Sequence, residues 1–234
     1  MNSDLDLRRI PLDNAFNFRS LGGYAGHGGM VTRHGVFYRS GWLNGLSPRD
    51  KERIKALGIR TIIDLRSKAE TIERPDDFLD DPEITHIHID VMAALNPEKL
   101  GKLFRRDAKN VLSSLYKAML EESKEEVKRV ILSVAQGLDR GGVLFHCMVG
   151  KDRTGLTAML LLSIAGVDVM DILADYEVSE TYIDMVQDHM GSKKENMMLT
   201  LEHIRAHYGT PAEYLRQIGI SNEILDKICG RFLK

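Results

Sequence analysis

The feature that most constrains this chain is a ten-residue stretch at positions 146–155, with the sequence HCMVGKDRTG. The apolar run at 142–145 predicts a short buried strand before it, and residues 156–165 predict an apolar helix after it. Cys147 is therefore expected at a strand end and Arg153 at a helix start. A turn of this kind directs successive backbone N–H groups inward, next to the positive end of the helix dipole. The stretch predicts a cup that binds a phosphate group.

The residues of this loop also predict a reaction. Arg153 offers a planar fork that can hold two phosphate oxygens, and Gly150 permits a backbone conformation closed to other residues. The same positive field favours a thiolate, so we expect Cys147 to ionise below the ~8.5 of a free thiol and to attack phosphorus. His146 is expected to fix the loop, and the Thr154 hydroxyl to donate to the sulfur. The predicted phosphate-binding residues are His146, Met148, Val149, Gly150, Lys151 and Thr154.

The spacing C-x5-R-T resembles that of cysteine-dependent tyrosine phosphatases, and the longer pattern HCxxGKDRTG resembles their bacterial and fungal tyrosine phosphatase-like family. Two further stretches agree with that family: NFRSLGGY at 17–24 and GIRTIIDLRS at 58–67. The likeness runs from about residue 14 to the end, with least support between 75 and 140. It implies a phosphatase that uses no cofactor and acts on phosphotyrosine proteins, phosphoserine or phosphothreonine, or phosphoinositides.

Two other classes of function stay open at this point. A catalytically weak phosphate-binding module would keep the cup without turnover, although the presence of Cys147, Asp152 and Arg153 together argues against it. A rhodanese-type sulfurtransferase also uses a loop cysteine, but it does not call for the Gly-Lys-Asp-Arg-Thr-Gly continuation.

The general acid has three candidates. Asp152 lies inside the loop next to Arg153 and could protonate the leaving oxygen if its side chain turns toward the cup. Asp90 ends the strand predicted before the catalytic one, where dual-specificity phosphatases carry their acid. Asp64 also ends a strand, but its neighbour Arg66 suggests an ion pair that braces the site. We favour Asp152.

The order of elements predicts an α/β fold, with a largely parallel central sheet covered by helices and a helical C-terminus. Strands are expected at 36–39, 61–65, 84–89 and 142–145. Helices are expected at 51–57, 97–121, 124–136, 156–165, 168–185, 193–207, 211–218 and 221–232. The 97–121 segment carries a basic cluster that fits either a solvated helix face or a lid over the pocket: Lys99, Lys102, Arg105, Arg106 and Lys109.

Composition predicts one phosphatase domain over residues 1–234, because the length and the hydrophobic fraction of 43% suit a single large core. A formal net charge of −2 suggests no nucleic-acid partner, and the longest uncharged run is too short for a transmembrane segment. The chain has two cysteines with no regular spacing, which makes a disulfide framework unlikely and fits a reducing compartment. Cys229 is expected to be a packing residue. We expect a cytoplasmic enzyme, with non-standard secretion or a removed signal left open.

Residues 84–89 alternate apolar and polar side chains, as in a strand with one packed face. His86 and His88 are therefore expected to point the same way as partly solvated strand residues. Without nearby Cys or carboxylate spacing they predict no metal site. A positive charge at Lys151 could favour polyanionic substrates or raise phosphate affinity in general, and the sequence does not separate the two.

Overall fold

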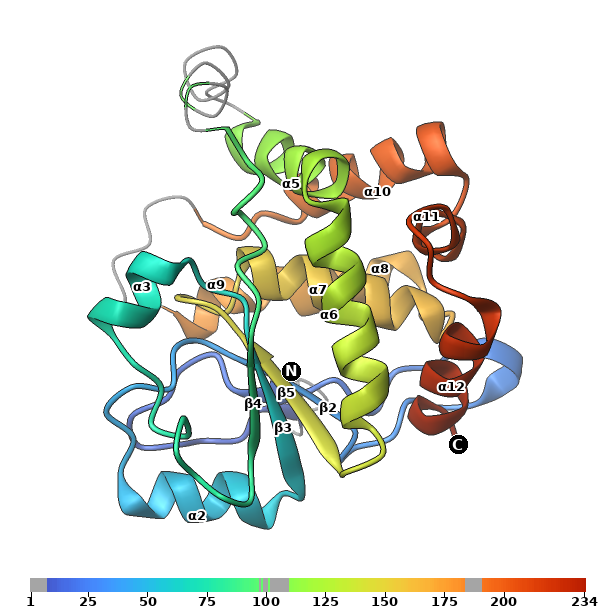
Figure 1. Cartoon of the computed structure of the whole chain (residues 1–234). Coiled ribbons are helices and arrows are strands. Elements are labelled where there is room, and N and C mark those ends of the chain that lie inside the picture. Colours follow the sequence, from blue (N-terminus) through green and yellow to red (C-terminus); the bar gives the residue numbers. More distant parts are fainter. Residues whose placement is uncertain (1–7, 97, 99–100, 102–109, 184–190) are drawn as a thin grey trace.

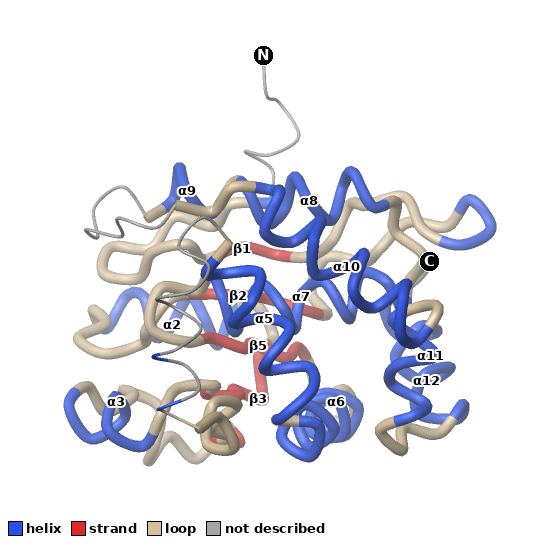
Figure 2. Tube along the Cα trace, turned by 90° about the horizontal axis from the view of Figure 1, so that it is seen from above, coloured by secondary structure: helices blue, strands red, loops and turns tan. Residues whose placement is uncertain are grey.

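A five-stranded sheet forms the centre of the computed structural model, which describes residues 8–96, 98, 101, 110–183 and 191–234. Its order is β1-β2-β5-β3-β4, seen for the first four strands in Figure 2. The bounds are β1 Arg19–Ser20, β2 Phe37–Ser40, β3 Ile59–Asp64, β4 Thr85–His88 and β5 Gly142–His146. All pairs are parallel except β1 with β2. The catalytic strand β5 is central, so its C-terminal end is flanked on both sides.

Alternating strand residues divide the core into two clusters. Phe37, Ile63, Val143 and Phe145 belong to the larger cluster, and the intervening Leu144 belongs to the smaller one. The period-two alternation of a strand puts these sets on opposite faces of the sheet. Helices α6 and α7 cover the first face, and α2 covers the second (Figure 1). The structure thus confirms a mostly parallel sheet flanked by helices.

Most expected helices are present, and the C-terminus is helical as predicted. Their bounds are α2 Pro48–Ala56, α3 Lys68–Glu73, α5 Val111–Glu122, α6 Lys124–Gly137, α7 Asp152–Ile164, α8 Val169–Glu177, α9 Ser179–Tyr182, α10 Lys194–Tyr208, α11 Pro211–Gln217 and α12 Asn222–Phe232, with a 3-10 turn η1 at His27–Gly29. Ser47 and Thr210 start α2 and α11 with capping boxes, in which each hydroxyl accepts from the N3 backbone and the N3 carboxylate returns the bond.

The single helix expected at 168–185 was wrong, because α8 ends at Glu177 and α9 begins at Ser179. Arg19 explains the break. Its Nη2 donates to the Asp175 carbonyl at 2.7 Å and to Ser179 Oγ at 3.0 Å. The Asp175 carbonyl would accept from the Ser179 N–H in a continuous helix, and Arg19 competes for that acceptor.

The segment expected at 97–121 lies partly outside the described residues, which exclude 97, 99–100 and 102–109 and with them the basic cluster of the lid hypothesis. The part that is described, α5, packs against α10, α6 and α7, and buries Leu112, Tyr116, Met119 and Leu120. Its C-terminal half is therefore a core helix.

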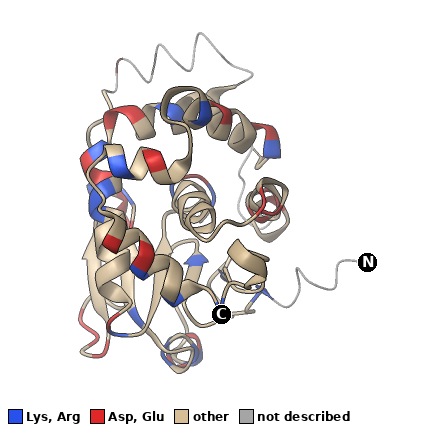
Figure 3. Ribbon diagram, turned by 90° about the vertical axis from the view of Figure 1, so that its right-hand side faces the viewer, with Lys and Arg blue, Asp and Glu red and all other residues tan. Residues whose placement is uncertain are grey.

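Charged residues of both signs share the same helices in Figure 3. In the described ranges, none of the helices combines the length and the apolar character needed to cross a membrane.

Candidate active site

The loop of residues 147–151 connects β5 to α7, as the sequence predicts. Gly150 has φ of 71°, and a Cβ there would lie 2.4 Å from the Ser40 carbonyl oxygen. Glycine is therefore required both by conformation and by close approach. The N–H groups of Met148, Val149 and Gly150 donate to no backbone or side-chain acceptor within the described residues. They are available to an anion.

Cys147 lies at the base of this loop and is 1% exposed. Burial opposes ionisation of the thiol, but Arg153 and hydrogen bonding from Thr154 outweigh burial and lower the pKa of Cys147 below its usual value. Thr154 Oγ1 is buried and has no hydrogen-bond acceptor within the described chain. A thiolate would give this hydroxyl its acceptor, which is why the pair favours the charged form.

Arg153 is held by Glu70, a residue that the sequence analysis did not single out. The Nη1 and Nη2 groups of Arg153 donate to the two carboxylate oxygens at 2.6 and 2.8 Å. Burial opposes ionisation of Glu70, but the bonds from Arg153 and from Ser67 hold the pKa of Glu70 at about 2. The same carboxylate closes the capping box of α3 through Ser67. This end-on pair leaves the Nε side of the guanidinium for a second oxyanion.

Asp152 is the first residue of α7, and its side chain is 24% exposed. Its carboxylate accepts a hydrogen bond from the Tyr116 hydroxyl, which is in turn 2.6 Å from the Tyr176 hydroxyl. Burial and the neighbouring Asp152 raise the pKa of Tyr116 well above its usual value, so Tyr116 remains a donor. The sequence analysis did not predict this chain of hydroxyl groups from Tyr176 through Tyr116 to Asp152.

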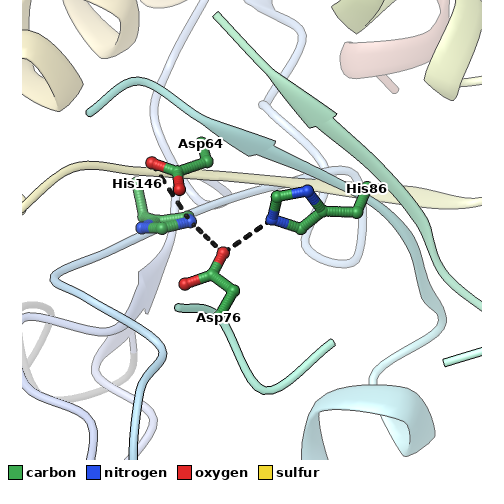
Figure 4. Close-up of side chains that lie close together, drawn as sticks. All are labelled: Asp64, Asp76, His86 and His146. Carbon is green, nitrogen blue, oxygen red and sulfur yellow. Dashed lines mark hydrogen bonds and ion pairs between the residues drawn. The ribbon is translucent and has the colours of Figure 1, made fainter. Parts of the chain in front are cut away.

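His146 is completely buried, and its Nε2 lies 2.8 Å from Asp76 Oδ2. His86 Nε2 lies 2.7 Å from the same oxygen, so both rings turn toward Asp76 (Figure 4). Burial disfavours the imidazolium of His146, but the charge and hydrogen bond of Asp76 outweigh it and raise the pKa of His146. His146 is thus anchored as expected, through Asp76.

Arg66 completes this buried group. Its Nη2 contacts Asp64 Oδ2 at 2.6 Å and Asp76 Oδ1 at 2.9 Å, so the ion pair expected between Asp64 and Arg66 is present. One possible metal-ligand set in the described chain is this group, since ligand atoms of Asp64, Asp76, His86 and His146 lie within 4.8 Å of one another. The Arg66 guanidinium already provides a positive charge for the carboxylates of Asp64 and Asp76.

The two strand histidines are intermediate and exposed in burial, and each also has a partner that the sequence did not predict. His86 is drawn into the buried group by Asp76, and its side chain is 9% exposed. His88 is exposed, and its Nε2 lies 2.8 Å from the Arg66 carbonyl oxygen. The alternation of apolar and polar residues predicted strand β4, but it could not predict that Asp76 and the Arg66 carbonyl would contact its histidines.

Three further residues named from the sequence have partners or surroundings of their own. Asp90 makes a turn, in which its carboxylate accepts from the Met92 N–H at 3.0 Å. Lys151 is buried, and its Nζ donates to the Gly191 carbonyl at 3.0 Å. Cys229 is half-buried in α12, and burial raises the pKa of its thiol.

Comparison with known proteins identifies the family of this chain. The chain matches the model of the tyrosine phosphatase family over residues 10–234. A tyrosine-protein phosphatase of Nostoc commune is 29% identical over 82% of this chain and 72% of its own length. The triple specificity protein phosphatase PtpB of Mycobacterium tuberculosis is 25% identical over 97% of this chain and 99% of its own length. Among solved structures, P. aeruginosa TpbA matches with a TM-score of 0.46 at 14% identity, over 82% of this chain and 91% of TpbA.

Proposed function

Since this chain belongs to the tyrosine phosphatase family, and is therefore a phosphoric monoester hydrolase, we propose that it acts by covalent catalysis with Cys147 as the nucleophile. The observation that carries this proposal is the buried Cys147 thiol, whose pKa is lowered by Arg153 and Thr154 at the base of a loop with unused N–H groups. A buried thiol without those neighbours would have a raised pKa and would be inert.

In the first step, the Cys147 thiolate attacks phosphorus and the bond from phosphorus to the ester oxygen breaks. Arg153 and the loop N–H groups stabilise the charge on the three other phosphate oxygens. The leaving oxygen takes a proton from Asp152, whose carboxyl group is oriented by the Tyr116 hydroxyl. The product is a thiophosphoryl enzyme and a free alcohol or phenol.

In the second step, water attacks phosphorus and gives a proton to the Asp152 carboxylate. The sulfur–phosphorus bond breaks, inorganic phosphate leaves, and the Thr154 hydroxyl stabilises the departing thiolate. The Lys151 ammonium donates to the Gly191 carbonyl at 3.0 Å and lies 3.9 Å from Asp152 Oδ1, so Lys151 contributes its backbone N–H to phosphate binding and its charge to holding Asp152.

For substrate we propose phosphotyrosine proteins, phosphoinositides or both. The support is the family membership together with PtpB, whose name assigns that relative triple specificity. Initial rates on matched phosphotyrosine and phosphoserine peptides and on a soluble phosphoinositide would rank these classes. A chain that releases no phosphate from any of the three contradicts the proposed substrate range.

The nucleophile is tested with 4-nitrophenyl phosphate. Cys147→Ser should lower kcat by more than about 10⁴-fold, because a hydroxyl does not ionise at neutral pH, and it should still bind orthovanadate. Cys229→Ser is the matched control and should keep full activity. Turnover by Cys147→Ser above about 1% of wild type excludes the thiophosphoryl route.

The acid is tested by leaving-group dependence. Asp152→Asn should slow phosphoserine hydrolysis about 10²–10³-fold and the activated nitrophenyl ester much less, because a poor leaving group needs the proton most. Asp90→Asn, from the turn after β4, is the comparison. An equal loss on both substrates would assign Asp152 to loop geometry, and a selective loss in Asp90→Asn would move the acid to that turn.

A further inference from the structure

The N-terminal NFRS stretch reaches the far side of the catalytic loop. Asn17 is 3% exposed and has φ of 58°, which is unusual for a residue with a side chain. Its Nδ2 donates to the carbonyl oxygens of Val149 at 3.0 Å and Gly150 at 2.9 Å. These contacts join residues 132 and 133 positions apart, so one amide fixes two successive loop carbonyls.

Arg39, on β2 beside the central strand, binds the Gly150 carbonyl as well and also the carbonyl that follows it. Its Nη2 donates to the Gly150 carbonyl at 2.7 Å and to that of Lys151 at 3.4 Å, and its side chain is fully buried. Farther back, the N–H of Trp42 donates to the Met148 carbonyl at 3.0 Å. Four consecutive loop carbonyls, from 148 to 151, therefore accept bonds from residues 17–42.

The carbonyl of one residue and the N–H of the next lie on opposite sides of a planar peptide unit. Drawing the carbonyls of 148–151 outward thus turns the N–H groups of 149–152 toward the opposite side, which is the phosphate cup. An unheld loop could rotate these peptide units, and its N–H groups would then lose their common direction.

The same network carries excess positive charge. Asp175 is the shared carboxylate of two buried arginines: it contacts Arg19 Nε at 2.9 Å and also accepts from Arg39 Nη1. Burial opposes its charge, but both arginines hold the pKa of Asp175 at about 2. Two guanidinium groups share one carboxylate, and Arg39 Nε is buried without a partner in the described chain. Burial and the neighbouring Arg19 lower the pKa of Arg39 to about 10, and the negative charges of Asp175 and of the Cys147 thiolate act in the opposite direction.

We infer that Asn17 is a positioning residue of the phosphatase reaction: together with Arg39 it holds the loop carbonyls outward and so aims the loop N–H groups at the oxyanion. This inference rests on the proposed function. A purely structural role would cost stability without changing how the folded loop binds an oxyanion.

The test replaces Asn17 by two residues with different backbone consequences. Asn17→Gly removes the amide while suiting the positive φ, so the folded backbone is retained. Asn17→Asp keeps the shape but places an oxygen against two carbonyls, so its loss should be larger. The buried control is Thr32→Val, which removes a hydroxyl that donates to the Leu21 carbonyl at 2.9 Å.

Three quantities are measured on each folded variant: the dissociation constant of orthovanadate, the pH midpoint of Cys147 alkylation by iodoacetate, and kcat on 4-nitrophenyl phosphate. Asn17→Gly should weaken vanadate binding about tenfold, raise the alkylation midpoint and lower kcat, since both bonds to the loop carbonyls are lost together with the bond from Arg19 Nη1 to Asn17 Oδ1. Thr32→Val should lower the melting temperature and change none of the three.

Two outcomes overturn the inference. One is a folded Asn17→Gly and Asn17→Asp pair with wild-type vanadate affinity and alkylation midpoint, and the other is an equal loss in Thr32→Val. A different result would sink the proposed function itself: a wild-type chain that neither hydrolyses 4-nitrophenyl phosphate nor binds vanadate.

Discussion

Two regions support the catalytic loop from opposite sides, and they act on different parts of it. Residues 17–42 hold its backbone, by donating to the carbonyls of 148–151. Residues 64–88 hold the side chains that flank the loop: Glu70 pairs with Arg153 of α7, and Asp76 pairs with His146 at the end of β5. The first region uses donors on carbonyls, and the second uses carboxylates on cations. The direction of the loop N–H groups and the position of the Arg153 guanidinium are therefore fixed by separate sets of contacts.

Arg153→Lys removes the guanidinium that Glu70 holds, and it should have the largest effect among the variants that test these two regions. A lysine cannot span two phosphate oxygens or the two oxygens of Glu70, so kcat/KM should fall about 10²–10³-fold. Steady-state kinetics on 4-nitrophenyl phosphate measures this, with the exposed Arg140→Lys as control. Unchanged kcat would show that Arg153 is structural.

Asp76→Asn should cost about 3 kcal/mol of unfolding free energy, because it leaves buried His146 without its nearest counter-charge and Arg66 with Asp64 alone. The pKa of Asp76 is held below its usual value, with burial opposed mainly by His146. A lowered pKa stabilises the fold above the ordinary value of about 4 and loses that contribution as the pH falls below it. Urea unfolding at pH 7 and pH 3 should show the wild type and the variant converging at low pH. The exposed Asp80→Asn is the control, and a constant difference would contradict the ion-pair account.

Glu70→Gln tests the second region alone, because it weakens the hold on the Arg153 guanidinium and leaves the bonds to the loop carbonyls unchanged. We expect kcat/KM to fall about tenfold, equivalent to about 1.4 kcal/mol, with vanadate binding changed less than in Asn17→Asp. Since the pKa of Glu70 is about 2, its ion pair should persist as the pH falls through 4.5 and disappear near 2. Glu73→Gln, on the same short helix and 70% exposed, should match the wild type. If Glu70→Gln and Glu73→Gln lose kcat/KM equally, the ion pair between Glu70 and Arg153 does not contribute to activity.

Cys229→Ser lies outside both regions and should have the smallest effect. Its thiol pKa is raised by burial and by Asp226, so iodoacetate at neutral pH should modify Cys147 first. Mass spectrometry of partially alkylated protein identifies the site, and phosphate should protect it. Prior modification of Cys229 would reverse the assignment of the reactive thiol.

The local geometry of the loop could be predicted from sequence, because strand, glycine turn and helix follow one another within 15 residues. Cys147, Gly150 and Arg153 are placed by that order alone. Their supports could not be predicted in the same way. Asn17 binds the Gly150 carbonyl of the loop, and Asp175 binds Arg19, across more than 100 positions of sequence. No periodicity relates positions that far apart, so the sequence could not predict these contacts.

Glu70 had a partial signal. The pattern Ser67-x-x-Glu70 is typical of a capping box and would have predicted α3, which the sequence analysis left out. It could not have shown that the same carboxylate reaches Arg153, because that contact depends on how α3 sits against the loop. The helix expected at 168–185 failed for a related reason, since the break depends on Arg19 from a distant strand.

The wide sequence separation of the loop contacts has a consequence for how the protein folds. Asn17 with Gly150, Glu70 with Arg153 and Arg19 with Asp175 close chain segments of 133, 83 and 156 residues. Such non-local contacts carry the loop-closure entropy of a slow-folding topology, so the cup should be among the last features to form during refolding. Phosphate or vanadate should then bind only the finished fold and stabilise it by about 2.7 kcal/mol at a hundred times its dissociation constant. The binding of a small anion would thereby report on the completed assembly of the whole chain.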